Sequence, residues 1–237
     1  MVADKRSPVT FPKIPVLLYH HVHDMEENFF RVMPAKLREQ MELLLEAGYL
    51  PVHPDRLIGL KGQSALPEKY VLVTFDDAYE DFLFHAWPVL RELGIPTLLF
   101  VISDYIGGWN DWDPLRVSRH RHLDCDQLIA LRDEGVIIGS HTCTHPALPY
   151  ISREDQLSEI KDSKKKLEDL LGISVRALSY PGGHVNGQIA AMVAEQYDLG
   201  FATSVQVKGR FHDPYFIPRI DPWFFGDLNE FRKALQF

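Results

Sequence analysis

Short apolar runs alternate along the chain with longer segments in which apolar residues recur at helical spacing. The short runs predict seven strands, and the longer amphipathic segments predict six helices between and after them. The predicted strands are residues 14–20, 71–75, 97–102, 136–139, 175–180, 200–204 and 216–220. The predicted helices are residues 34–47, 79–93, 124–134, 153–171, 187–196 and 227–235.

Two of the helices carry clear boundary signals. The helix over 34–47 has Pro34 in its first turn and Gly48 just beyond its last residue. The helix over 153–171 follows Ser152, a residue type that caps helix N-termini, with Asp155 three positions later.

Near-continuous apolar strands that alternate with helices are typical of a parallel sheet buried on both faces. Such a chain forms either an incomplete (β/α) barrel or an open wound sheet. Both architectures place their chemistry beyond the carboxyl ends of the strands. The residues that directly follow the predicted strands are therefore the candidates for function.

Polar residues gather at five of these strand ends. They are His20 and His21 after the first strand, Asp76 and Asp77 after the second, His141 and His145 after the fourth, Pro181, Gly182, Gly183 and His184 after the fifth, and Arg219 and Asp221 at the last.

Composition narrows the class of protein. The 237 residues suit one domain, 1–237, in which we expect residues 1–13 to form a flexible arm. The net charge of −8, without a basic block, makes nucleic acid an unexpected partner, and the apolar runs are too short to span a membrane. Two cysteines, Cys125 and Cys143, cannot form a disulfide framework. The first residues lack the apolar stretch of a signal peptide, so we expect a cytoplasmic protein or one whose leader has been removed.

His141 and His145 are four residues apart, a spacing that puts two side chains on one face of a helical turn. Two imidazoles with one carboxylate make a metal site that leaves positions open for water and substrate. The adjacent pair Asp76–Asp77 allows one carboxylate to bind the cation while the other acts as a base. The same donors also suit a non-haem iron oxygenase.

Three segments resemble the motifs of a known family, the polysaccharide deacetylases of carbohydrate esterase family 4, which carry the NodB homology domain. Residues 74–79, TFDDAY, resemble the TFDDG motif, and residues 140–145, SHTCTH, resemble the motif H-[ST]-x-x-H. Residues 179–183, SYPGG, resemble the third motif with its strand-end proline. The resemblance covers the chain from about Pro15 to Trp223.

The resemblance implies a distorted (β/α)7 barrel and a metal-dependent hydrolase that removes acetyl groups from sugars. It implies that Asp77, His141 and His145 bind one divalent metal ion and that Asp76 is the general base. The backbone N–H of Gly182, after Pro181, would stabilise the oxyanion. Zinc is the expected metal, and cobalt, nickel or iron suit the same donors.

The chain departs from the family pattern at three places. Ala78 replaces the glycine of the first motif, and a methyl group fits there without strain only at negative φ, so we expect a mild change. Ser179 replaces the arginine that pairs with the base, which leaves Arg219 and Asp221 as candidates for that role.

The third departure is the absence of the family's usual C-terminal L-x-H motif, which carries the general acid. Residues 18–20, LYH, supply that pattern at the first strand instead. This resembles the circularly permuted branch that includes the poly-N-acetylglucosamine deacetylases. It makes His20 the candidate acid, with His184 as a rival, and His21 is expected to face the opposite side.

Some further residues have weaker roles. Trp223 and Leu18 could line an apolar pocket for the acetyl group, and Cys143 is expected to point away from the metal. The remaining histidines are expected on the surface or in loops: His23, His53, His85, His120, His122 and His212.

The sequence thus predicts a hydrolase that removes N-acetyl groups from a glycan containing N-acetylglucosamine, such as a polysaccharide or peptidoglycan. O-acetyl ester hydrolysis on a glycan, or amide hydrolysis of a compound that is not a sugar, would use the same site. A sugar-binding module with an inactive site is a further alternative, which the retained Asp76, Asp77, His141 and His145 argue against.

Overall fold

Six of the seven apolar runs form one parallel sheet. The computed structural model describes residues 14–24, 30–59, 68–113, 118–203 and 213–235, so the expected arm over residues 1–13 lies outside the described residues. Neighbouring strands run in the order β1-β5-β6-β7-β8-β9, and the short β4 also pairs with β5. The strands are β1 (Val16–Tyr19), β4 (Leu50–Pro51), β5 (Tyr70–Phe75), β6 (Thr97–Val101), β7 (Ile137–Ser140), β8 (Ala177–Ser179) and β9 (Leu199–Phe201). The pair β2 (His21–Val22) and β3 (Arg31–Val32) forms a separate small sheet.

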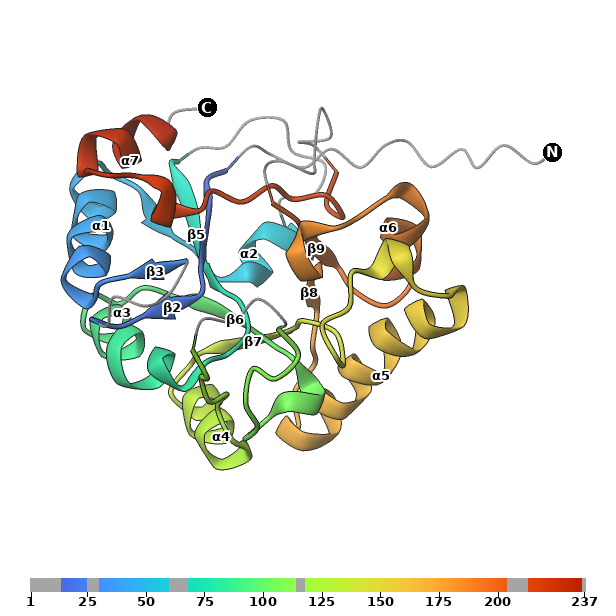
Figure 1. The fold of residues 1–237 in the computed structure, drawn as a ribbon. Coiled ribbons are helices and arrows are strands. Elements are labelled where there is room, and N and C mark those ends of the chain that lie inside the picture. The colour runs from blue at the N-terminus through green and yellow to red at the C-terminus, as the bar shows by residue number, and fades with distance from the viewer. Residues whose placement is uncertain (1–13, 25–29, 60–67, 114–117, 204–212, 236–237) are drawn as a thin grey trace.

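Helices surround the curled sheet, as Figure 1 shows. They are α1 (Pro34–Glu46), α2 (Pro54–Gly59), α3 (Trp87–Glu92), α4 (Cys125–Asp133), α5 (Arg153–Leu171), α6 (Gly187–Ala194) and α7 (Leu228–Ala234). The predicted cap of α5 is confirmed, because Ser152 Oγ accepts the backbone N–H of Asp155 at 3.1 Å. None of the helices in the described ranges has both the length and the apolar character that a membrane crossing requires.

The seventh predicted strand, 216–220, is not a continuous strand. Ile217 forms a parallel bridge with Phe201 of β9, and Ile220 forms one with Leu17 of β1. Between them stands Pro218, which has no N–H to donate and so interrupts the ladder. Residues 213–220, called the closing segment below, therefore connect the two edges of the curled sheet. The architecture is the distorted (β/α) barrel in one α/β domain that was predicted, and the open-sheet alternative is excluded.

The predicted helix over 79–93 begins later than expected. Tyr79 instead forms a bridge with His122, and the first helical turn is a π-helical one over Phe82–Ala86. Helix α3 then begins at Trp87, with Pro88 in its first turn. Because Pro88 cannot donate a backbone hydrogen bond, the α-helical ladder starts afresh at this point.

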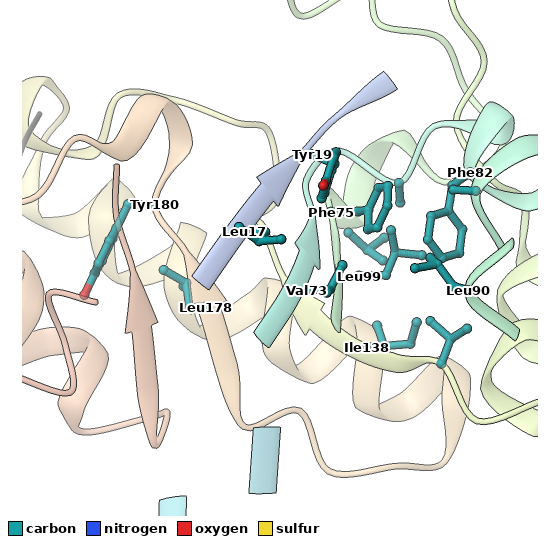
Figure 2. Packing of buried hydrophobic residues seen from close by; sticks show 14 of the residues in the cluster. Leu17, Tyr19, Val73, Phe75, Phe82, Leu90, Leu99, Ile138, Leu178 and Tyr180 are labelled. Carbon is teal, nitrogen blue, oxygen red and sulfur yellow. The ribbon is translucent and has the colours of Figure 1, made fainter. Parts of the chain in front are cut away.

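Alternation along the strands divides the apolar side chains into two layers. One set faces the helices and includes Phe75, which meets Phe82 edge-on with ring centroids 4.9 Å apart; Figure 2 shows part of this layer. The other set fills the inside of the curl and includes Val16, Leu72, Phe100 and Phe201. The strand positions that face the inside of the curl are followed, at the strand ends, by the polar candidate residues.

Candidate active site

The inward-facing register continues past the ends of the strands into polar side chains. His20 follows Leu18 by two positions, Asp76 follows Thr74, and His141 follows Gly139. Side chains two apart on a strand share a face, so the alternation that builds the inner layer also brings these residues together. The predicted opposite orientation of His21 is confirmed, because its ring stacks on Tyr79 with centroids 3.9 Å apart.

Arg219 of the closing segment binds Asp76 through both guanidinium arms. Nη1 donates to Asp76 Oδ1 and Nη2 donates to Asp76 Oδ2, each at 2.7 Å. Ser179 lies between them: its hydroxyl accepts from Arg219 Nη2 at 2.8 Å and donates to Asp76 Oδ2 at 3.0 Å. Arg219 is 2% exposed and also donates to the carbonyl of Ala202 at 3.1 Å. The serine at the arginine position of the third motif thus belongs to a network whose arginine comes from another strand end.

Arg219 sets the charge state of Asp76. Burial alone would raise the pKa of Asp76, but the guanidinium charge, its two hydrogen bonds and nearby His141 hold that pKa well below its ordinary value. Asp76 is therefore a charged carboxylate at neutral pH despite being 3% exposed.

Asp77, His141 and His145 converge on one point, as predicted for the metal-ligating set. Asp77 Oδ1 lies 3.4 Å from His141 Nε2 and 3.7 Å from His145 Nε2. Two ligands held ~2.0–2.2 Å from one ion at a tetrahedral angle are ~3.3–3.6 Å apart, so these two separations are close to those of a divalent metal site, and all three donor atoms lie within 4.8 Å of one another.

The donor atoms are also in the state that a metal requires. His141 Nδ1 lies 2.8 Å from the carbonyl of Ser179, which can only accept, so Nδ1 carries the proton and Nε2 presents a lone pair. Burial lowers the pKa of both His141 and His145. Asp77 Oδ1 is buried and has no hydrogen-bond partner among the described residues. Burial, followed by the charge of Asp76, raises the pKa of Asp77 well above its ordinary value, a cost that a bound cation would offset.

Unusual backbone angles occur at two of these ligands and next to the third. Asp77 and Ala78 have φ of 69° and 54°, and Thr142 and His145 have φ of 66° and 63°. The expectation that Ala78 keeps a negative φ is therefore wrong, and the helical turn expected over 141–145 is replaced by a loop. Without the bend at Asp77, strand alternation would point its carboxylate away from His141. Left-handed backbone at non-glycine residues is costly and concentrates at functional sites.

Neighbouring residues hold the strained loops in place. Glu159 of α5 accepts the backbone N–H groups of Cys143 and Thr144 at 2.8 and 2.9 Å. Trp112 packs its ring on His145, with centroids 3.9 Å apart, and donates its indole N–H to His122 Nε2 at 3.1 Å. Since Nε2 accepts, His122 Nδ1 must donate to the carbonyl of Asp77 at 2.7 Å. Trp112 was not predicted as a site residue, because residues 107–113, GGWNDWD, carry no pattern beyond two tryptophans among glycine and polar residues.

His20 lies beside the charged pair. Its Nδ1 is buried with no hydrogen-bond partner in the described ranges, and burial lowers its pKa to about 4 against the opposing pull of Asp76. Its ring centroid is 5.2 Å from that of Phe30, which in turn lies 5.6 Å from Trp223. These aromatic rings make one side of the site apolar.

The other predicted residues are distributed around this centre. Leu18 is 3% exposed and lies two residues before His20, on the same inward-facing side of the chain. Pro181 and Gly182 form a single turn two residues after Ser179, with Gly182 at φ 58°. Asp221 accepts the backbone N–H of Trp223 at 3.1 Å, and burial raises its pKa to about 6. His184 packs against Tyr150.

Two further expectations concern residues near the ligands. Cys143 Sγ lies 3.8 Å from Lys166 Nζ, outside the metal-ligating set, as expected. His23 and His122 lie outside the regular helices and strands, as expected for loop residues, but both are buried rather than on the surface, at 6% and 2% exposed. His53 and His85 are exposed, and His212 lies outside the described residues.

Comparisons with known proteins agree on one family. Residues 63–202, more than half of the chain, match the family model for polysaccharide deacetylase. A Bacillus subtilis protein, YxkH, assigned provisionally as a polysaccharide deacetylase, is 30% identical over 88% of this chain and 71% of its own length. The poly-beta-1,6-N-acetyl-D-glucosamine N-deacetylase of Staphylococcus epidermidis is 30% identical over 69% of this chain, which spans 58% of that enzyme. The structure of the Streptococcus pyogenes deacetylase PplD in complex with acetate superposes with a TM-score of 0.77 at 25% identity, over 98% of this chain and all of that one.

Proposed function

Since the chain belongs to the polysaccharide deacetylase family, we propose that it is a metal-dependent hydrolase that removes N-acetyl groups from a glycan containing N-acetylglucosamine. The observation that carries this proposal is the convergence of Asp77, His141 and His145 beside a separate, charged Asp76. The Staphylococcus epidermidis relative supports the choice of sugar through its named activity.

Asp77, His141 and His145 would hold one divalent ion, with zinc as the expected metal because two imidazoles and a carboxylate are common donors of hydrolytic zinc. The bound ion would polarise the acetyl carbonyl and lower the pKa of a nearby water. The unpartnered Asp77 Oδ1 and the lone pair on His141 Nε2 support this assignment.

Asp76 is suited to act as the base. Arg219 and Ser179 use three of its acceptor positions, which leaves a lone pair for the attacking water. Because Arg219 keeps the carboxylate charged, it is available to take the water proton as the water oxygen bonds to the acetyl carbon. The pairing with Arg219 also fixes its orientation.

His20 is suited to deliver a proton to the leaving nitrogen. Because its resting state is neutral, it must first take up a proton from solvent, which negative charge developing next to it would favour by raising its pKa, and the proton held by Asp76 returns to solvent after acetate leaves. When the C–N bond breaks, the proton from His20 converts the leaving nitrogen into a free amine, and acetate is the other product. The N–H of Gly182 is the candidate oxyanion donor, and Phe30 and Trp223 offer an apolar surface for the acetyl methyl group.

Acetate release tests the proposal. Zinc-loaded enzyme should release acetate from β-1,6- or β-1,4-linked N-acetylglucosamine oligomers, and chelation followed by zinc addition should remove and restore that activity. Acetylated xylan and peptidoglycan fragments are the comparison substrates. Release from xylan alone would favour the O-acetyl esterase, and release from none of the glycans would contradict the proposal.

A further inference from the structure

A second group of possible ligands lies outside the site described above. His21, His23, Asp81 and His120 each offer one ligand atom, and these four atoms all lie within 4.8 Å of one another. We call these four residues the histidine cluster. They come from three segments: β2 and the residue after it, the residue that precedes the π-helical turn Phe82–Ala86, and the residues that precede α4.

We propose that the histidine cluster binds a second divalent metal ion, of the zinc type, in a structural role. Imidazole and carboxylate both bind zinc, and four protein ligands fill its tetrahedral shell, as in closed zinc sites. The proposed catalytic set has three protein ligands and leaves room for water. The two sets thus differ in the way that structural and catalytic sites differ.

Contacts within the cluster support a common focus. His21 Nδ1 lies 2.6 Å from Asp81 Oδ2, and Asp81 Oδ1 accepts the backbone N–H of Val22 at 3.4 Å. The ring of His120 lies 4.4 Å from that of His21 and 5.6 Å from that of His23, centroid to centroid. A hydrogen bond between one histidine and one aspartate would not require two more imidazoles around the same carboxylate.

The ligand spacing needs only small adjustments. Tetrahedral zinc ligands lie ~3.3–3.6 Å apart, so the 2.6 Å contact between His21 and Asp81 would open and the wider separations would contract. Side-chain rotation is enough for shifts of this size. His120 Nε2 contacts Ser118 Oγ at 2.6 Å, a type of contact that orients metal-ligating rings.

The burial of the cluster gives the metal a stabilising role. His21 and His23 are 5% and 6% exposed, and burial lowers the pKa of His21 to about 3. Burial also raises the pKa of Asp81 to about 7, against the opposing effects of His23, His120 and His85. On coordination His21 would exchange its contact with Asp81 for the cation, which would offset the cost of a buried carboxylate.

Tyr79 separates the histidine cluster from the candidate active site. One face of its ring stacks on His21 at 3.9 Å, and it also stacks on His122 at 4.8 Å. His122 in turn donates to the carbonyl of Asp77. A metal in the histidine cluster would therefore tie together three segments that support the loop carrying Asp77, without contacting the substrate.

Measuring the zinc content of variants in which the two sites are disabled one after the other tests this proposal. The full chain, dialysed against zinc and then buffer, should retain two equivalents by mass spectrometry. The variant Asp77→Asn/His141→Gln should retain one, and adding His23→Gln/His120→Gln should remove it. His85→Gln, an exposed histidine near Asp81, is the matched control and should not change the count.

Two further readouts keep the test independent of activity and of folding failure. In the Asp77→Asn/His141→Gln variant, Co²⁺ should give the visible bands of tetrahedral coordination, and zinc should raise the thermal midpoint. If the four-site variant does not fold, His120→Gln alone should weaken zinc retention in that background, because His120 lies at the edge of the cluster. A folded Asp77→Asn/His141→Gln variant that binds no zinc would overturn the second site, and the proposed deacetylase function would be unaffected.

Discussion

Arg219 and Asp76 are 143 positions apart in the sequence, yet they share two hydrogen bonds of 2.7 Å in the buried centre of the molecule. The arginine comes from the closing segment and the aspartate from the end of β5. Arg219 thus gives the proposed base both its orientation and its charge.

Replacing Arg219 with lysine should keep the charge but lose the two-armed contact. We expect kcat/KM to fall at least ~10-fold and the free energy of unfolding to fall by ~1–3 kcal/mol. A weaker partner lets the pKa of Asp76 rise, so the acid side of the pH–kcat/KM profile should move to higher pH. Arg176→Lys, at an exposed ion pair with Asp198, is the control and should cost under ~1 kcal/mol. An unshifted acid side would contradict the tuning role.

Asp76 and Asp77 should respond differently to the same change. Asp76→Asn should retain zinc and lose ~10²–10⁴-fold in turnover, because it removes the base. Asp77→Asn should lose both zinc and turnover, because it removes a ligand. Zinc content by mass spectrometry and acetate release check the pair. Equal zinc loss in both variants would show that the two roles are shared or reversed.

His20→Ala should separate amide from ester chemistry. An amine leaves poorly unless it is protonated, whereas an activated phenol leaves easily. We expect ~10²-fold or greater loss of N-deacetylation and a much smaller loss on an activated aryl acetate. His184→Ala is the matched comparison, and the opposite pattern would reassign the acid to His184.

Asp221→Asn should change the pH dependence of stability. The folded-state pKa of Asp221 is about 6, above its ordinary 3.8, so between these values the folded protein holds a proton that the unfolded chain releases. The contribution of Asp221 to folded-state stability therefore falls as pH rises from about 4 to about 6 and is constant above that. Because the variant lacks this titrating group, the free energy of unfolding of the variant minus that of the wild type should increase by on the order of 1 kcal/mol from pH 4 to pH 7.5. Urea unfolding at the two pH values measures this, and a constant difference would count against it.

Ala78→Gly should relieve backbone strain. A left-handed alanine costs roughly 1–2 kcal/mol, part of which is offset because glycine makes the unfolded chain more flexible. We expect a net gain of up to ~1 kcal/mol in thermal or urea unfolding. Ala130→Gly, inside α4, should instead lose about 1 kcal/mol. Destabilisation by both changes would show that the methyl group of Ala78 matters more than its angle.

Much of the fold could be predicted because burial and periodicity are local properties of sequence. The runs that became β1 and β5–β9 are mostly apolar, and α5 has the predicted bounds because Ser152 and Gly172 mark its ends. Pro218 could have signalled the break in the closing segment, but a single proline does not show that its two neighbours pair with opposite edges of the sheet.

The candidate site was predictable in its residue types but not in its backbone. Strand-end position identified Asp76, Asp77, His141 and Arg219. The left-handed angles at Asp77, Ala78 and His145 depend on contacts from distant residues such as Glu159 and His122, which periodicity does not report. The burial of His23 and His122 was not predicted for the same reason. A histidine in a loop is expected to be exposed unless the elements that pack around it are known.

The closing segment has a consequence for how the protein is made. A ribosome will have synthesised every predicted metal ligand and the base well before it reaches Arg219. Until then the emerging chain holds an aspartate at the end of β5 without the arginine that compensates its charge, and the sheet lacks the segment that joins its edges. Closure of the barrel and the pairing of the buried base with its arginine therefore both wait for the closing segment, and a chain interrupted before residue 213 would lack both.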